Sequence, residues 1–411
     1  MINYMSHKIK LNFILYMILF LILIFLREPN YFINSRIWAE EGTIYLNDAM
    51  KYGWSSFLHS NLGYYSFYNK LASLLTSELP KKYFSDSFLF FSILPMLSLF
   101  KVLFSLFEMN KLTYCKLMLF GIIVVYLPTY EIWLNTITSQ FWLLVSALLI
   151  LFLKIEGRFE KTLVLVSSLT GPFSIVYVPI YIFKKYKESG WKFNSILVFF
   201  NVALVVSVLI QFFSVVGIIT GVSEVNELEQ GGQRFFNFNL ISLVKGFFGY
   251  YISYPFLGIY LSNFKFIYIF LTLLVFIAQL YFLYKIIKSI DSLFWLFIAG
   301  SCISFMTLFA SIGGSGGLRY AFSWHIIFIF FLLNNQCNKS KILNLIRIIL
   351  LSICMISITL DQNNRKSPYY NSDWAGWKKQ LELSGPCNYD GIKIWPMNTE
   401  HVWNVKISKG C

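Results

Sequence analysis

The chain has 411 residues, of which 57% are hydrophobic and only 13% are charged, and its formal net charge is +14. Soluble domains are typically about half apolar and about one quarter charged, so this composition excludes a soluble globule and predicts an all-α polytopic membrane protein. The lysines and arginines gather between hydrophobic segments, as orientation signals do in membrane proteins. We therefore expect a lipid bilayer around the protein and no nucleic-acid partner.

Nine apolar segments predict transmembrane helices, each roughly long enough to cross a hydrocarbon core of about 30 Å with some tilt. Lys8 and Lys10 precede the first segment, so the positive-inside rule places the amino terminus in the cytoplasm. The odd number of spans then places the carboxyl terminus outside. The predicted spans are residues 11–26, 87–107, 112–128, 139–154, 195–218, 266–287, 292–312, 320–334 and 343–360.

These spans divide the chain into two regions. Residues 1–360 form a transmembrane domain, and residues 361–411 form a short external tail. The outer loops of the domain are expected at residues 27–86, 129–138 and 219–265.

Residues 162–183 form an apolar run with basic residues on both sides, including Lys154 before it and Lys184 after it. A single crossing would place one of these basic clusters outside. Gly171-Pro172 interrupts the run, and proline removes a backbone donor and disfavours helix at the residue before it. We therefore predict a re-entrant pair of half-helices, with an ordinary kinked span as the alternative.

Residues 240–262 are also apolar, but they contain Lys245 and Pro255, and no basic cluster follows them before residue 265. We expect this segment to pack at the outer face without crossing the membrane.

The acidic stretch at residues 36–49, just beyond the first span, contains Arg36, Glu40, Glu41 and Asp48. Ionisable groups at a membrane boundary cost free energy unless they are paired, solvated or used for chemistry. A positioned carboxylate can take the proton of a sugar hydroxyl as a general base. The alternative is an amphipathic loop helix whose acids face water.

The short outer loop between the third and fourth spans is the second candidate region. It carries Glu131 and Asn135, and Gln140 and Trp142 follow it. Aromatic faces stack on sugar rings and amides bond to hydroxyls, so these residues are candidates to line a sugar site. An aromatic belt at a helix end explains them equally well.

Cysteine and histidine positions bear on disulfides and metals. Cys387 and Cys411 lie in the external tail, whereas the other four cysteines fall in spans or at cytoplasmic ends. The tail pair alone lies where a disulfide persists, so we predict a Cys387–Cys411 bridge. The histidines are scattered, and no metal-ligand spacing or nucleotide-binding motif occurs, so we expect no metal and no cofactor.

Together these features resemble a known family. The motif Trp38–Gly42 (WAEEG), the break at Gly171-Pro172, the glycine-rich loop ending at Arg319-Tyr320 and the external tail are similar to the serotype-converting O-antigen glucosyltransferases of temperate phages. More widely, they resemble the GT-C membrane glycosyltransferases that use polyprenyl-phosphate sugars. The resemblance covers most of the chain as an order of features, and its one compact motif is the tryptophan with the paired acids.

The resemblance implies about nine spans, a re-entrant segment and an active site that faces the periplasm from the bacterial inner membrane. It also implies that glucose moves from undecaprenyl-phosphate glucose to lipid-linked O-antigen, with a functional link to a sugar-lipid flippase and a polyprenyl-phosphate glucosyltransferase. A carboxylate in the first outer loop is the base in GT-C enzymes, and motif position carries this role to Glu40 or Glu41. Some of these enzymes hold a metal with an Asp-containing pair, but the pair here is Glu-Glu, so no metal is carried over.

The residues can be assigned to steps of that reaction. Adjacent side chains on a helix point roughly 100° apart, so one glutamate alone reaches the sugar, and the other is expected to pair with Arg36 or a headgroup. We place the base at Glu41, because Gly42 beside it leaves room for a bulky ligand. Arg319 is the first candidate to hold the lipid phosphate, because it follows the glycine-rich residues 313–317. Further substrate-binding candidates are Trp38, Asp48, Lys70, Arg234, Tyr320 and His325, the last with a buried structural role as the alternative.

Two other classes of membrane protein would be expected in the same membrane. A polyprenyl-linked sugar flippase or other transporter would also be basic and polytopic, but internal repeats and charges at mid-depth are typical of transporters, and the sequence has neither. An O-antigen polymerase or ligase would share the lipid-linked substrates. Those enzymes depend on arginines in a late outer loop, whereas here the acids gather in the first.

Overall fold

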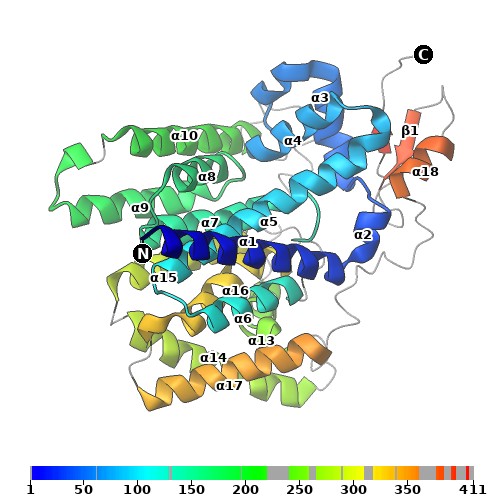
Figure 1. The fold of residues 1–411 in the computed structure, drawn as a ribbon. Helices are drawn as coiled ribbons and strands as arrows, with labels where there is room; N and C mark the ends of the chain where they lie inside the picture. The colour runs from blue at the N-terminus through cyan, green and yellow to red at the C-terminus, as the bar shows by residue number, and fades with distance from the viewer. Residues whose placement is uncertain are drawn as a thin grey trace.

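The computed structural model describes most of the chain and consists mainly of helices (Figure 1). The described residues are 2–61, 63–127, 129, 132–195, 197–219, 240–258, 265–287, 290–309, 318–337, 340–360, 376–383, 390–394 and 404–406. The long helices of the bundle are α1 (Ile2–Arg27), α5 (Phe84–Glu108), α6 (Tyr114–Tyr126), α7 (Ser139–Leu153), α8 (Arg158–Ser168), α9 (Ser174–Glu188), α10 (Phe199–Ile219), α14 (Lys265–Ile287), α15 (Asp291–Phe309), α16 (Leu318–Leu333) and α17 (Lys341–Leu360).

Short elements fill the connections between these helices. The first outer loop folds into α2 (Pro29–Ile33), the π-helix η1 (Glu41–Leu46), α3 (Asn47–Tyr52), η2 (Gly53–Leu58), α4 (Phe67–Ser77) and η3 (Lys81–Tyr83). Further short helices are η5 (Phe193–Ser195), α12 (Leu240–Gly246), η6 (Phe247–Ser253), α13 (Tyr254–Leu257) and η8 (Asn335–Cys337). The tail contains α18 (Gly376–Leu383), β1 (Asp390–Lys393) and β2 (Asn404–Lys406).

Among the described residues, five helices are long and apolar enough to cross a membrane. They are Lys81–Glu108, Phe199–Val216, Phe266–Lys285, Asp291–Phe309 and Lys341–Leu360. Four shorter apolar helices coincide with the other four predicted spans, namely Asn12–Arg27, Tyr114–Tyr126, Ser139–Leu153 and Leu318–Leu333. A helical membrane protein is therefore supported, and the count of nine crossings stays a prediction.

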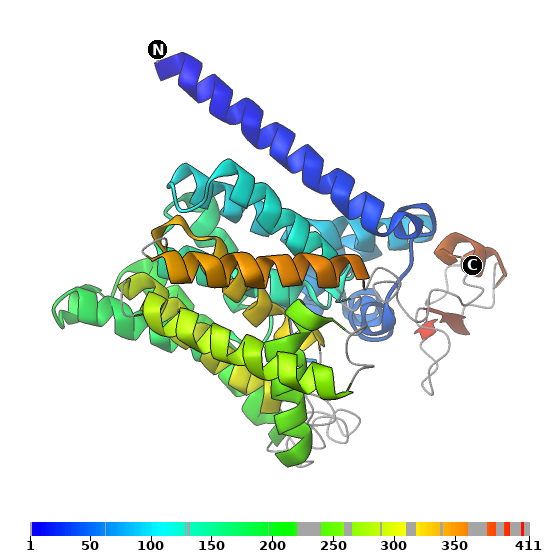
Figure 2. The ribbon, with the colours of Figure 1, turned by 90° about the horizontal axis from the view of Figure 1, so that it is seen from below.

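Helix α7 lies at the centre of the bundle. Every one of its residues is buried, which is typical of a helix that is hydrophobic on all sides and packed within a larger protein. Helices α5, α8, α15 and α16 surround it. Helix α1 lies at one edge, as Figure 2 shows, and packs one face inward, where the ring of Phe20 stacks on Phe100 at 3.9 Å. Its other side exposes apolar side chains such as Ile14 and Leu26.

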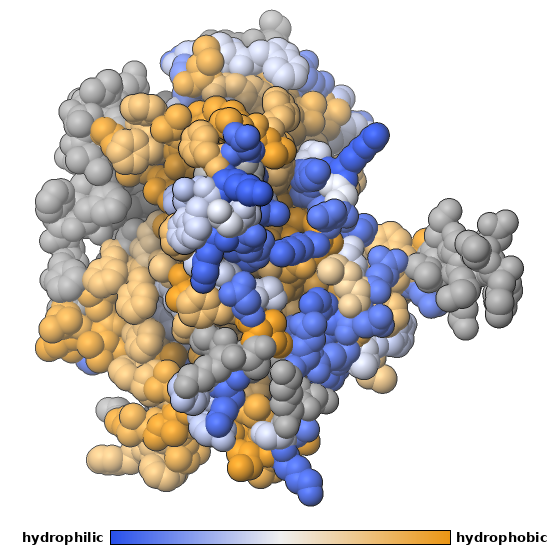
Figure 3. Space-filling model, turned by 90° about the vertical axis from the view of Figure 1, so that its left-hand side faces the viewer, coloured by the Kyte–Doolittle hydropathy of each residue, from blue (hydrophilic) through white to orange (hydrophobic). Residues whose placement is uncertain are grey.

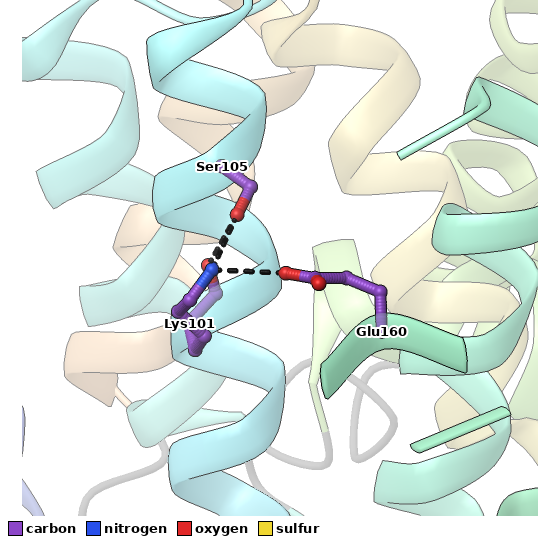
Figure 4. A network of polar contacts seen from close by, with 3 residues as sticks. All are labelled: Lys101, Ser105 and Glu160. Carbon is purple, nitrogen blue, oxygen red and sulfur yellow. Dashed lines mark hydrogen bonds and ion pairs between the residues drawn. The ribbon is translucent and has the colours of Figure 1, made fainter. Parts of the chain in front are cut away.

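Residues 162–183 lie in a helical hairpin formed by α8 and α9. The hairpin begins just after α7 ends, and Lys154 at that end forms an ion pair with Glu188 at the end of α9, with Nζ 3.2 Å from Oε2. Both ends of the hairpin therefore lie at the same end of the bundle. A second ion pair of 3.0 Å, between Lys101 of α5 and Glu160, holds the start of α8 in place (Figure 4). The re-entrant position of the α8–α9 hairpin in a membrane stays a prediction.

The tip of this hairpin meets the first outer loop. The backbone N–H of Phe67 donates to Leu169 at 3.0 Å, and the N–H of Gly171 donates to Tyr65 at 3.1 Å. The Gln211 side-chain amide of α10 bonds to both backbone groups of Tyr65, at 2.7 and 3.0 Å. The loop segment around Tyr65 is thus hydrogen-bonded to both the hairpin tip and α10.

Residues 240–257 form one helix with a π-helical centre, η6. This helix packs against α14, α16 and α17. The His325 ring of α16 donates from Nε2 to the Tyr250 carbonyl at 2.7 Å, so the segment packs against the side of α16 about two turns after the helix begins. Whether this segment crosses a membrane stays a prediction.

The tail adds a small β-structure that the all-α prediction omits. Strands β1 and β2 pair antiparallel, with Ile392 opposite Val405 and an irregularity between Asp390 and Ile392. Trp377 of α18 donates from its indole to the Lys81 carbonyl at 2.9 Å and from its backbone to Ser35 at 3.2 Å. The tail is therefore docked on the first outer loop.

Candidate active site around the acidic motif

Glu41 is the first residue of η1 and is 1% exposed. Its Oε2 atom accepts from the backbone N–H of Trp38 at 2.7 Å. Its Oε1 atom accepts from both the backbone N–H and the hydroxyl of Thr136, the latter at 2.9 Å. Glu41 therefore joins the acidic motif to the loop before α7. π-helical turns occur frequently at functional sites, which makes the start of η1 a suitable position for a reactive group.

The surroundings of Glu41 shift the pKa of its carboxyl group. Burial raises the pKa of this carboxyl to about 7, and the hydrogen bonds from Thr136 and Trp38 and the positive charge of Arg36 oppose that rise. Glu41 therefore titrates near neutral pH. Such a value suits a general base, but both of its oxygens are already occupied by hydrogen bonds.

Arg36 is buried beside aromatic rings. Its guanidinium carbon lies 3.3 Å from the centre of the Tyr31 ring and 5.2 Å from that of Trp38. Burial lowers the Arg36 pKa, and the nearby charge of Glu41 raises it in part. The sequence predicted that the glutamate that is not the base pairs with Arg36 or a headgroup. In the structure Arg36 and Glu41 interact through their charges, while the hydrogen bonds of Glu41 come from Trp38 and Thr136.

Glu40 differs from its neighbour. Its side chain is half-buried, and among the described residues it has no hydrogen-bond or ion-pair partner. Its charge acts on the phenol of Tyr45, one turn further along η1. The two adjacent glutamates thus occupy unequal positions, one saturated with hydrogen bonds and the other open.

A cluster of hydroxyl and amide groups lies around Tyr45. Burial raises the pKa of the Tyr45 phenol, and Asn69 and Ser66 beside its hydroxyl lower it by smaller amounts. Asn69 is 1% exposed, and no hydrogen bond of good geometry satisfies its amide. Buried amides and hydroxyls usually have partners, so this cluster is well suited to take further hydrogen bonds from a polar ligand.

Gln140 joins this cluster from the start of α7. Its Nε2 atom donates to the Tyr64 hydroxyl at 3.3 Å, while its Oε1 atom has no partner and is buried. A Cβ atom at Gly171 would lie 2.3 Å from that oxygen, and the φ of Gly171 is +89°. A glycine is therefore required here, because both the backbone conformation and the approach of Gln140 exclude a side chain.

Four predicted binding residues have structural contacts. Asn135 accepts at Oδ1 from the backbone N–H and hydroxyl of Thr138, the residue just before α7. Trp142 is fully buried, and its indole donates to the Ile132 carbonyl at 3.2 Å. Lys70 is buried and donates to the Ser56 carbonyl at 2.8 Å, and Asp48 accepts from Asn61 at 2.8 Å. These contacts organise the outer loops around the site.

The first part of α16 carries three further candidates. Arg319 donates to the Tyr320 hydroxyl at 3.1 Å, and the Tyr320 ring meets Phe141 edge-on at 6.1 Å. Tyr320 therefore lies beside the residue that follows Gln140. His325 is buried and bonds to a backbone carbonyl, which supports the structural interpretation of this histidine. Trp38, by contrast, is half-buried and covers Arg36.

Some predicted site residues lie outside the described residues. They are Glu131, Arg234, the glycines of residues 313–317, Cys387 and Cys411.

The space beside Gly42 is filled, contrary to the sequence-based expectation. A Cβ atom on Gly42 would lie 2.5 Å from Val405 and 2.6 Å from Ile394, both in the tail. These side chains join Ile37, Leu46, Phe84 and Trp377 in one buried apolar cluster. Gly42 therefore makes room for the tail. The expected space for a bulky ligand beside Gly42 is absent, so it does not favour Glu41 over Glu40 as the base.

Sequence reasoning missed Thr136, Tyr45 and Asn69. Each is an ordinary residue type at its position, and its part in the site arises from contacts between distant segments. The aromatic and amide density of residues 61–69 is a sequence signal that could have identified Asn69, and it does not extend to Thr136 or Tyr45.

Comparisons with protein-family models, with curated proteins and with solved structures find no match for this chain.

Proposed function

We propose that the protein is an inverting membrane glycosyltransferase, which moves glucose from undecaprenyl-phosphate glucose to lipid-linked O-antigen on the periplasmic face of the bacterial inner membrane. The observation that carries the proposal is the open carboxylate of Glu40 beside buried hydroxyl and amide groups, on a loop that Glu41 fastens to the bundle. The resemblance of the WAEEG motif to serotype-converting glucosyltransferases supports the sugar and the lipid carrier.

Glu40 is the base in this mechanism. Its carboxylate takes the proton of the acceptor hydroxyl while that oxygen bonds to the anomeric carbon of the donor. The bond from the anomeric carbon to the phosphate oxygen breaks on the opposite face, so the configuration inverts and the lipid phosphate leaves with the bonding electrons. Glu41 positions the loop, because its buried hydrogen bonds fix the backbone from which Glu40 projects.

The other residues of the site have binding roles. Gln140, Tyr64 and Asn69 present amide and hydroxyl groups, which suit sugar hydroxyls. Arg319 at the outer end of α16 offers positive charge to the leaving phosphate, and its bond to Tyr320 orients it. No metal takes part in the proposed steps.

The donor has to reach the outer face of the membrane before transfer. This requires an enzyme that makes the polyprenyl-phosphate glucose and a flippase that turns it over, so genes for both are expected to work together with this protein.

The test is transfer by the purified protein in liposomes that contain polyprenyl-phosphate glucose and lipid-linked O-antigen. Mass spectrometry of the acceptor should show one added hexose, and NMR of the product should show an inverted anomeric centre. A transporter would move lipid-linked sugar across the membrane without changing the acceptor mass, and that result would overturn the proposal.

A further inference from the structure

A cavity lined by charged residues lies at the end of the bundle opposite the acidic motif. It has a volume of about 500 Å³ and is formed by the ends of α7 and α9, the start of α8 and the start of α10. The end of α7 lines this cavity, whereas the residues just before the start of α7 contact the acidic motif through Thr136. The positive-inside rule makes this the cytoplasmic end. Figure 3 looks onto it and shows hydrophilic residues gathered in a band that hydrophobic residues border.

The charged residues that line this cavity leave an excess of positive charge. Lys154, Lys161 and Lys185 face Glu156 and Glu188. Glu188 already forms ion pairs with Lys154 at 3.2 Å and with the buried Lys184 at 3.1 Å. Among the described residues, neither Lys161 nor Lys185 forms an ion pair with a carboxylate. The ammonium groups of Lys161 and Lys185 in the lining are therefore opposed by Glu156 alone, and the cavity favours an anion.

Part of the cavity wall is apolar. Ile150, Ile155, Val198 and Phe200 lie beside the charged groups. A neighbouring groove along α9 and α10 is almost entirely apolar and has a volume of about 390 Å³, with Val178, Pro179, Ile182, Val205 and Val208 among its lining residues. Both spaces use the same pair of helices, so a ligand with a charged head and an apolar tail can occupy them together.

We propose that this cavity binds the headgroup of an anionic phospholipid, with the phosphate against Lys161 and Lys185 and an acyl chain in the groove between α9 and α10. Basic pockets between membrane helices at the cytoplasmic side have the chemistry that anionic headgroups require. A soluble phosphate would gain nothing from the apolar walls, which favours the lipid. The bound lipid would fasten α9 to α7 and α10, the elements that support the helical hairpin.

The experiment measures lipid binding to the full-length protein in detergent by native mass spectrometry, with phosphatidylglycerol and phosphatidylcholine as probes. The protein should bind phosphatidylglycerol at least tenfold more tightly. The double variant Lys161→Gln/Lys185→Gln should weaken that binding about 30-fold, because each lysine near a phosphate contributes roughly fivefold. Phosphatidylcholine has a phosphate but no net charge, so its binding should fall much less. Both lysines lie at the surface of the cavity, so the variant should keep the melting temperature of the parent.

The matched control is Lys51→Gln/Lys82→Gln, which removes the same charge at the other end of the molecule and should bind phosphatidylglycerol like the parent. Three outcomes would overturn the proposal. They are parental affinity in the Lys161/Lys185 variant, an equal loss in the control variant, and displacement of the lipid by millimolar inorganic phosphate, which would indicate a site for a soluble anion.

Discussion

The Glu41 carboxylate accepts hydrogen bonds from both the backbone amide and the hydroxyl of Thr136, although 95 residues separate the two in the chain. With the further bond from Trp38, a single buried side chain fastens the first outer loop to the segment that begins α7. Glu40 is left half-buried beside the cluster around Tyr45. The two adjacent acids thus lie in different environments, and under the proposed function Glu41 positions the loop while Glu40 is the base.

The raised pKa of Glu41 predicts that the outer loop loses stability as pH rises. Burial moves the pKa from 4.5 to about 7. Between these values the folded loop keeps a proton that the unfolded loop has released, so stability falls through that window and the loss is complete above it. Each pKa unit corresponds to about 1.4 kcal/mol, so the full effect is roughly 3 kcal/mol. Hydrogen exchange of residues 36–46 at a series of pH values measures it.

The Glu41→Gln variant is the control for this prediction, because glutamine does not titrate. Its loop should open with a free energy that is flat over the same pH range, after correction for the intrinsic exchange rate. Identical pH profiles for the parent and the variant would show that Glu41 is not the titrating group.

The contact between Gly42 and the tail predicts that a small side chain at position 42 releases the tail. A Cβ atom there would press on Val405 and Ile394, and overpacking of this kind costs about 1–3 kcal/mol. Gly42→Ala should therefore speed tryptic cleavage at Lys379 and Lys393. The control is Gly249→Ala, where a Cβ atom meets nothing within 4 Å, and its tail should be cut at the parental rate. Equal rates in both variants would contradict the observed packing.

The sequence predicts helices well where apolar length decides the structure. Each of the nine apolar runs contains a helix, and α8 and α9 are separate helices on either side of Gly171-Pro172. Both features could be predicted because the length of an apolar run and the effect of proline are local properties of the sequence. The contacts of Glu41 with Thr136 and of Gly42 with Val405 could not be predicted in this way. They join segments that are distant in the chain, and neither residue type nor spacing specifies which distant partner a buried carboxylate or a glycine meets.

The basic residues predict a cytoplasmic amino terminus and an external carboxyl terminus. Alkaline phosphatase fused after residue 383, at the end of α18, should be active, and the same enzyme fused after Lys154 should be inactive. An inactive enzyme at the first position, with an active cytoplasmic reporter there, would remove the odd number of crossings.

Cys387 and Cys411 remain predicted to form a disulfide, because an external tail lies in an oxidising compartment. Peptide mapping by mass spectrometry without reduction should recover one linked peptide from freshly isolated membranes. Both cysteines recovered as free thiols would refute the bridge.

Under the proposed function Glu40 is the general base. Glucosylation of lipid-linked O-antigen tests this role in cells that carry Glu40→Gln or Glu41→Gln at matched protein levels. Glu40→Gln keeps the shape of the side chain but removes its basicity, so the rate should fall by roughly 10²-fold or more while protein stability is unchanged. Glu41→Gln places an amide N–H against a backbone donor and should lower loop stability by about 1–3 kcal/mol with a smaller loss of rate. Glucosylation at the parental rate by Glu40→Gln would exclude Glu40 as the base. If Glu41→Gln alone were inactive, Glu41 would be the base.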